Sequence, residues 1–172
     1  NETGPGSSSM DDDPTGERFL LDVMLGTLAV YLRACGHDAA YALDRGIEAD
    51  DRIVELSDEE NRRLLTRDRA LAERVDDAIE IVSRDVEAQL TELREAGIDL
   101  EIAAKPARCG RCNGELRPVS PDAETPEHAP DPATTDCWRC RSCGQLFWKG
   151  SHHERMKQVL EDVENGLSDR VR

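Results

Sequence analysis

The chain has 172 residues, a formal net charge of -15 and an isoelectric point near 4.6. This length suits one medium-sized domain with a small module beside it. The negative charge opposes long-range attraction to nucleic acid, although molar salt weakens that objection because it screens charges beyond about 3 Å. Arginine far outnumbers lysine, and this acidic composition is similar to that of halophilic, cytoplasmic proteins. An acidic partner-binding surface is the alternative.

Short apolar runs alternate with helical patterns after an N-terminal segment, residues 1–17, whose Gly, Ser, Pro and Asp predict a disordered tail. The runs expected to be strands are 18–23, 39–43, 63–66 and 78–83. The segments expected to be helices are 24–35, 50–61, 70–76 and 86–96. This α/β alternation over 18–98 predicts one domain built on a parallel sheet flanked by helices. The chain shows no apolar stretch near the roughly 20 residues of a membrane span and no apolar core of a secretory signal.

Two Cys-x-x-Cys pairs follow this domain, and each precedes a turn-forming glycine. The four cysteines are Cys109, Cys112, Cys140 and Cys143. Two such pairs supply the four thiolates of a tetrahedral structural zinc site, so 105–150 is expected to be a zinc ribbon. Cys137 opens a second possible register, but Gly144 directly after Cys143 favours the pair Cys140 and Cys143. Six cysteines used in this way suit a reducing cytosol better than a disulfide scaffold.

The ribbon contains one insertion and is followed by one further segment. Between the cysteine pairs, residues 118–136 contain five acidic residues and five prolines, which predicts an exposed, flexible insertion. Residues 151–167 show a helical apolar stripe. Basic and aromatic residues gather around both pairs, and this combination favours RNA contact through phosphates and stacked bases. The candidate contacts in the ribbon are Arg139, Arg141 and Lys149. The alternative is that the aromatic residues form a small core and the arginines keep it soluble.

Carboxylates stand where strands of the expected sheet end or helices begin. Asp22 and Asp68 follow apolar strands, and Asp50 opens the helix expected over 50–61, with Asp51 one step away; one of these two is expected to cap that helix. Ligands of open α/β sheets bind at the carboxyl ends of the strands. Carboxylates that converge there repel one another unless a cation such as Mg²⁺ or Mn²⁺ joins them. Asp85 is a weaker fourth candidate, and any single Asp could instead cap a helix.

Arginines near these carboxylates could bind a substrate phosphate. Arg67 and Arg69 flank Asp68, where they either grip a phosphate or neutralise nearby acids. Arg33, at the end of the first expected helix, fits a phosphate contact or a salt bridge.

The order of these motifs resembles the Mut7-C RNase domain family. The matching segments are FLLD at 19–22, LTRDR at 65–69, CGRCNG at 109–114, CRSCG at 140–144 and FWKGSH at 147–152. The resemblance spans nearly all of 18–157. It implies a PIN-like fold with a C-terminal zinc ribbon, in a salt-adapted archaeal member. It further implies a ribonuclease in which Asp22, Asp50 and Asp68 hold Mg²⁺ or Mn²⁺.

Two rival interpretations stay open. The chain could be a non-catalytic module that binds RNA, a ribosome or a protein on a PIN-like scaffold, because fold alone does not establish activity. A toxin-like nuclease that requires an antitoxin is the third interpretation.

Overall fold

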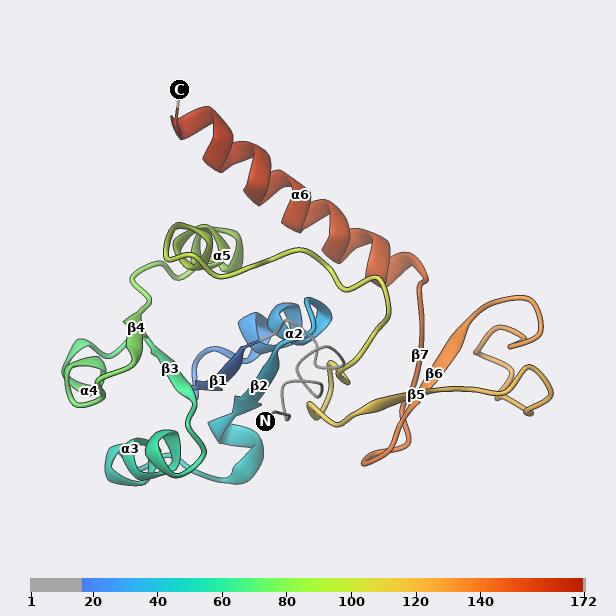
Figure 1. Cartoon of the computed structure of the whole chain (residues 1–172), viewed down its shortest axis with the longest axis horizontal. Helices are drawn as coiled ribbons and strands as arrows, with labels where there is room; N and C mark the ends of the chain where they lie inside the picture. The colour runs from blue at the N-terminus through green and yellow to red at the C-terminus, as the bar shows by residue number, and fades with distance from the viewer. Residues whose placement is uncertain (1–16, 172) are drawn as a thin grey trace, which may run out of the picture.

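The computed structural model describes residues 17–171, with side chains up to residue 166. Its first sheet has four parallel strands in the order β2-β1-β3-β4, which confirms the expected architecture (Figure 1). The strands are β1 Arg18–Leu21, β2 Asp38–Tyr41, β3 Arg63–Thr66 and β4 Ala78–Glu80. The tail expected at 1–17 lies outside the described residues except for Glu17, whose main-chain N–H donates to His37 Nδ1 at 2.8 Å.

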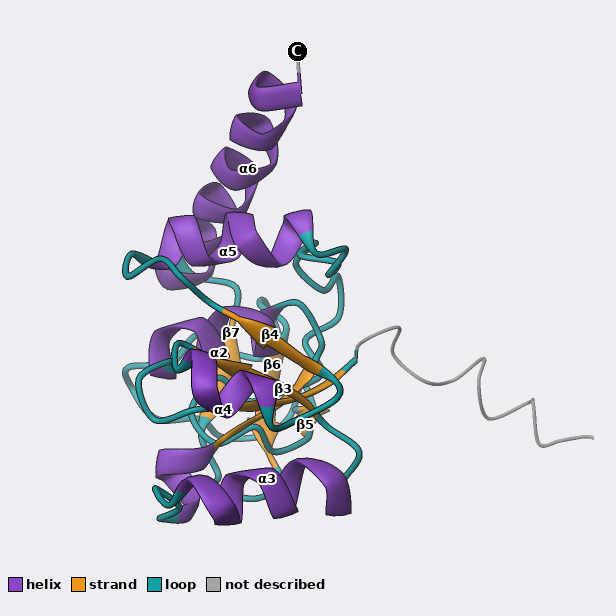
Figure 2. Ribbon diagram, turned by 90° about the vertical axis from the view of Figure 1, so that its left-hand side faces the viewer, coloured by secondary structure: helices purple, strands orange, loops and turns teal. Residues whose placement is uncertain are grey.

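Helices cover both faces of this sheet, because side chains of a strand alternate between its faces. The helices are α2 Gly26–Ala34, α3 Asp50–Glu59, α4 Arg69–Glu73 and α5 Val86–Glu95. From β1, the fully buried Phe19 and Leu21 belong to the core that includes residues of α2 and α5. Leu20 points to the other face and packs with residues of α3 and α4. Figure 2 shows α3 and α5 on opposite sides of the strands.

Three local expectations differ from the structure. The strand expected over 39–43 ends at Tyr41, and a 3₁₀ turn, η1 Ala42–Arg45, follows. β4 is shorter than 78–83 because the Glu92 carboxylate accepts the N–H groups of Val82 and Ser83 at 2.9 and 2.7 Å, in place of a neighbouring strand. The expectation that Asp50 or Asp51 caps α3 is wrong. Ala49 is the N-cap, and both aspartates lie in the first turn, where the helix dipole favours negative charge.

A second sheet contains three antiparallel strands in the order β5-β6-β7. The strands are β5 Leu116–Pro118, β6 Cys137–Cys140 and β7 Leu146–Trp148. The segment from 119 to 136 forms turns and contains no helix or strand. Arg108 and Glu115 add an isolated antiparallel bridge around the first cysteine pair.

The final helix, α6 Ser151–Val171, connects the second sheet back to the first (Figure 1). Leu160 and Val163 enter the core shared with α2 and α5. Arg94 of α5 also forms an ion pair with Glu164 of α6 at 2.8 Å. None of the helices in the described range combines the length and apolar character needed to cross a membrane.

Candidate functional site

Asp22 and Asp68 are connected through one buried hydroxyl at the carboxyl edge of the parallel sheet. Asp22 directly follows β1, and its N–H continues the pairing with β3 by donating to the Leu65 carbonyl at 3.0 Å. Thr66, the last residue of β3, is 0% exposed. Its Oγ1 donates to Asp22 Oδ2 at 2.7 Å and accepts the Asp68 N–H at 3.0 Å. The sheet thereby holds both aspartates on neighbouring strand ends.

The other carboxylates differ in how they are engaged. Asp68 is exposed and caps α4, with Oδ1 accepting the Leu71 N–H at 3.2 Å. Asp51 pairs with Arg74 at 2.6 Å, whereas the exposed Asp50 forms no ion pair within the described part of the chain. Asp85 is exposed and caps α5 through the Ala88 N–H at 3.2 Å. Helix capping therefore explains why an aspartate stands at position 85. Of the two aspartates in the first turn of α3, Asp51 is held in an ion pair and Asp50 is in none among the described residues.

The structure does not gather Asp22, Asp50 and Asp68 into one compact cluster. Over residues 17–166, the cysteines form the single group of three or more ligating side chains whose donor atoms all lie within 4.8 Å of one another. The carboxylate oxygens of the three aspartates therefore do not all lie within 4.8 Å of one another. Carboxylates that serve a pair of ions about 4 Å apart can be more widely spaced than those around a single ion.

Arg67 lies at the same edge with an unsatisfied donor. One of its terminal nitrogens donates to the Val82 carbonyl at 3.3 Å, while its Nε is buried and has no hydrogen-bond partner among the described residues. A buried unpaired donor costs about 1–3 kcal/mol, and such atoms are rare in native proteins. Arg69 instead forms an exposed ion pair with Glu73 at 3.3 Å. Of the two arginines, Arg67 alone carries an unexplained polar group.

Glu92 is a polar residue of this edge that sequence reasoning missed. Burial raises the pKa of its carboxyl, but the hydrogen bonds from Ser83 and Val82, together with Arg67, lower it by more, so its pKa lies below the ordinary value. Glu92 therefore stays ionised and holds the chain that leaves β4. Nothing in its helical position distinguished it from the many solvated acids of the sequence.

The four predicted cysteines lie together where the turn before β5 meets the end of β6 and the turn that follows it. The Sγ atoms of Cys109 and Cys143 are 3.7 Å apart, and those of Cys112 and Cys140 are 3.5 Å apart. Sulfurs held about 2.3 Å from a tetrahedral zinc ion are about 3.8 Å from one another, so this donor set fits zinc. Cys137 lies outside the cluster, with its Sγ 3.4 Å from the Thr135 carbonyl.

The turns around the cysteine cluster pack closely against its sulfur atoms. A Cβ on Gly114 would lie 2.7 Å from Cys140 Sγ, so glycine is required there. The N–H groups of Ser142 and Cys143 lie 3.3 and 3.4 Å from the same sulfur. Burial raises the pKa of Cys140, but these N–H groups, together with hydrogen bonds from the Cys112 and Cys143 side chains, lower it by more, to about 7. Burial raises the pKa of Cys109 and Cys112 instead, so the surroundings favour the thiolate, the form that binds metal, at Cys140.

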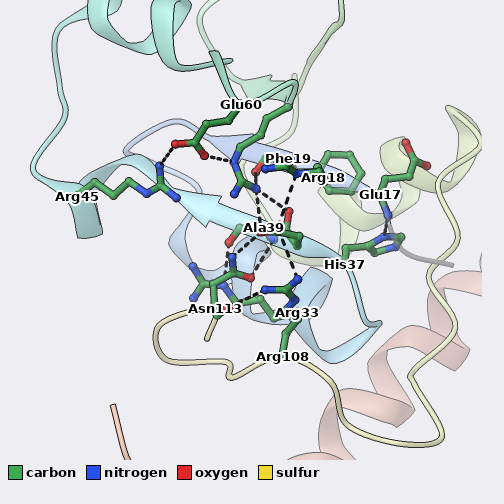
Figure 3. A network of polar contacts seen from close by, with 12 residues as sticks. Glu17, Arg18, Phe19, Arg33, His37, Ala39, Arg45, Glu60, Arg108 and Asn113 are labelled. Carbon is green, nitrogen blue, oxygen red and sulfur yellow. Dashed lines mark hydrogen bonds and ion pairs between the residues drawn. The ribbon is translucent and has the colours of Figure 1, made fainter. Parts of the chain in front are cut away.

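The first cysteine turn, residues 109–113, is fastened to the free edge of β2 (Figure 3). Asn113 Oδ1 accepts the Ala39 N–H at 3.0 Å, and its Nδ2 donates to Asp38 Oδ1 at 2.6 Å. Arg33, only 3% exposed, donates from Nε to the Ala39 carbonyl and from a terminal nitrogen to the Gly110 carbonyl, both at 2.9 Å. Arg33 is therefore a buried connection between α2, β2 and this turn.

The three basic residues expected to contact RNA are exposed but do not form one patch. Arg139 donates to the Gly144 carbonyl at 3.1 Å, and Arg141 pairs with Glu115 at 3.1 Å. With Arg117, these two line a shallow depression of about 800 Å³, in whose lining the described part of the chain places no acidic residue. Lys149 faces a different hollow, where its Nζ donates to the Ala104 carbonyl at 2.6 Å.

Comparison with known proteins gives one match. The family model described as the Mut7-C RNAse domain matches residues 17–160, which include the parallel sheet, the cysteine cluster and the first half of α6. Searches of curated proteins and of solved structures found no match. Because the family model covers most of the chain, the protein belongs to the Mut7-C RNAse domain family.

Proposed function

We propose that the protein is a metal-dependent ribonuclease that cleaves RNA phosphodiester bonds at the carboxyl edge of its parallel sheet. The observation that carries this proposal is the Thr66 hydroxyl, which connects the Asp22 carboxylate to the Asp68 main chain. It orients the Asp22 carboxylate and fixes the main chain of Asp68 at adjacent strand ends, the place where open α/β sheets bind ligands. Membership of a family described as an RNAse domain supports the same activity.

Asp22, Asp50 and Asp68 are the proposed ligands of Mg²⁺ or Mn²⁺. Their carboxylate oxygens are the hard donors that these cations prefer. When bound, the cation would activate a water molecule and stabilise charge on the phosphate. Thr66 positions the Asp22 carboxylate and the Asp68 main chain for this role, and the guanidinium of Arg67, next to Asp68, is the candidate phosphate contact.

The zinc ribbon contributes RNA contacts away from the carboxylate edge of the sheet. In this proposal residues 18–98 form the nuclease domain, and 105–150 form a ribbon whose zinc is structural. The depression lined by Arg139 and Arg141 offers phosphate contacts in an otherwise acidic chain. The unpaired thiols and the acidic composition suit a reducing, salt-rich cytoplasm.

A second candidate function is a non-catalytic module that binds RNA, a ribosome or a protein. The wide spacing of the three aspartates and the capping role of Asp68 favour it. This candidate function depends on the surface of the ribbon and needs no metal at the carboxylate edge.

An RNA cleavage assay at high salt separates the two candidates. It compares the wild type with Asp22→Asn and Asp68→Asn, with Mn²⁺ or a chelator, on structured and unstructured RNA. Asp85→Asn is the matched control, because Asn caps a helix as well as Asp does and Asp85 is already accounted for by capping. We expect Mn²⁺-dependent cleavage that falls at least about a hundredfold in the first two variants and persists in the control. Wild-type rates in both variants would refute the carboxylate assignment, and RNA binding without cleavage would select the second candidate.

A further inference from the structure

A cleft lies beside the C-terminal half of α2, at the end of that helix away from the carboxylate edge. Its volume is about 500 Å³, and it lies between α2, the first cysteine turn, β7 and the start of α6. Apolar and aromatic side chains form most of its lining, among them Val30, Phe147, Trp148 and Met156. This size and lining suit one planar organic group rather than an extended surface.

The charge of the cleft is opposite to that of the chain as a whole. The protein has 37 acidic residues among 172, yet no acidic residue of the part of the chain that the structure describes lines the cleft. Its lining includes Arg108, Arg111 and His152 instead. Arg108 is engaged with the Asn113 carbonyl and with Asp38, whereas Arg111 is exposed and reaches the side chain of Gln145 at 3.2 Å. The cleft is therefore complementary to an anion with an apolar, planar body.

We propose that this cleft binds one unpaired nucleotide of a single-stranded RNA, with the base among the aromatic side chains and a flanking phosphate at Arg111. Sequence-tolerant recognition of single strands combines these two elements, a stacking surface and a positive rim. The N-terminus of α6, at Ser151, also lies on the cleft. It adds positive potential to the rim, because a helix N-terminus carries partial positive charge. The inference rests on the proposed ribonuclease function and names how its substrate is held.

The cleft and the carboxylate edge lie at opposite ends of the same helix. α2 begins at Gly26, just after Asp22, while Val30, Arg33 and Ala34 of its later turns line the cleft. Nine helical residues span about 13 Å, so a bound nucleotide would be held away from the reacting phosphate. The cleft should therefore act on RNA binding and on KM, with little effect on kcat.

Photocrosslinking in a cleavage-deficient background tests the cleft directly. A short single-stranded RNA that carries one 4-thiouridine is irradiated with the Asp22→Asn protein, and the modified peptides are mapped by mass spectrometry. The same RNA annealed to its complement provides the comparison. We expect single-strand-specific crosslinks on the segments of Trp148 and Met156. Crosslinks confined to other segments, or equal crosslinking of the duplex, would overturn the proposal.

Two of the test substitutions narrow the cleft, and a third removes the exposed guanidinium of Arg111 from it. Ala34→Leu and Ala103→Leu fill the cleft from α2 and from the neighbouring loop, whose backbones are joined by the bond from the Ala103 N–H to the Ala34 carbonyl at 3.0 Å. Arg111→Ala removes the exposed guanidinium, and Arg52→Ala on α3 is the control for loss of one surface arginine. We expect the first three to weaken RNA binding about tenfold and the control to bind like the parent. Thermal unfolding and zinc content verify that each variant is folded.

The outcomes separate this inference from the proposed function. Metal-dependent cleavage by the wild type, with unchanged RNA affinity in all three cleft variants, would overturn the cleft proposal alone. Crosslinks in the cleft and weakened binding, with no cleavage by the wild type, would support the cleft and refute the nuclease. A cleft that captures an acidic peptide but no RNA would overturn the proposal in favour of a protein partner.

Discussion

Asn113, in the first cysteine turn, donates a 2.6 Å hydrogen bond to Asp38, the first residue of β2. Because the same side chain also accepts the Ala39 N–H, it occupies a position on the open edge of the parallel sheet that another strand would otherwise take. An uncovered edge strand invites association with other chains. The cysteine turn therefore closes this edge, and the two modules are stabilised together.

Replacing Asn113 by Gly should lower the free energy of unfolding by about 1–3 kcal/mol, because the Ala39 N–H and the Asp38 carboxylate both lose a partner. Asn113 has a φ of 70°, which glycine adopts freely. Asn113→Ala should therefore cost about 1 kcal/mol more than Asn113→Gly. Urea unfolding measures both changes. A glycine variant as stable as the wild type would show that the edge contact contributes nothing.

Cys143→Ser should abolish binding of one zinc ion per chain, whereas Cys137→Ser should keep it, because the sulfur of Cys137 lies outside the cluster. Zinc content after dialysis measures the difference. The cysteine turn is fastened to β2, so the variant that loses zinc should also unfold at lower temperature as a whole. Zinc lost from Cys137→Ser and kept by Cys143→Ser would assign the other register.

Thr66→Val removes the hydroxyl between Asp22 and Asp68 at nearly constant volume. Under the proposed function, we expect kcat for RNA cleavage to fall about tenfold, because the Asp22 carboxylate loses the hydrogen bond that orients it and the Asp68 main chain loses its contact with the same hydroxyl. Thr66→Ser retains the hydroxyl and should cleave close to the wild-type rate. Equal rates for the valine and serine variants would show that this hydrogen bond does not position the aspartates.

The stability of the fold should depend on the ionisation of Asp38. Burial raises the pKa of this carboxyl, but hydrogen bonds from Arg62 and Asn113 lower it by more, to below its ordinary value of 3.8. A carboxyl with a depressed folded-state pKa contributes stability that is present above the unfolded pKa of about 3.9 and is lost as the pH falls through the folded value. Unfolding measured from pH 7 down to about pH 2 should show this loss, and Asp38→Asn should show less of it. An identical pH profile for the two proteins would contradict the assignment.

Local patterns predicted the elements of the first domain well, because strand and helix periodicities are properties of neighbouring residues. The strand at Arg63–Thr66 and the helix that starts at Val86 follow from such patterns. The end of β4 was not predictable, since it depends on the carboxylate of Glu92, a residue of the next helix. The cap of α3 was also missed, because Asp50 and Asp51 are typical of both an N-cap and a first turn.

The sequence by itself determined the alternating elements, the strand-end positions of Asp22 and Asp68 and the spacing of the four cysteines. All of these depend on residues that lie close together in the chain. Tertiary structure alone decided that Arg33 fastens the cysteine turn, 77 residues away, and that Asn113 covers the edge of β2. It also decided that, among the described residues, Asp51 forms an ion pair while Asp50 forms none and no acidic side chain lines the cleft beside α2. These features require contacts between distant segments, whose register no local pattern specifies.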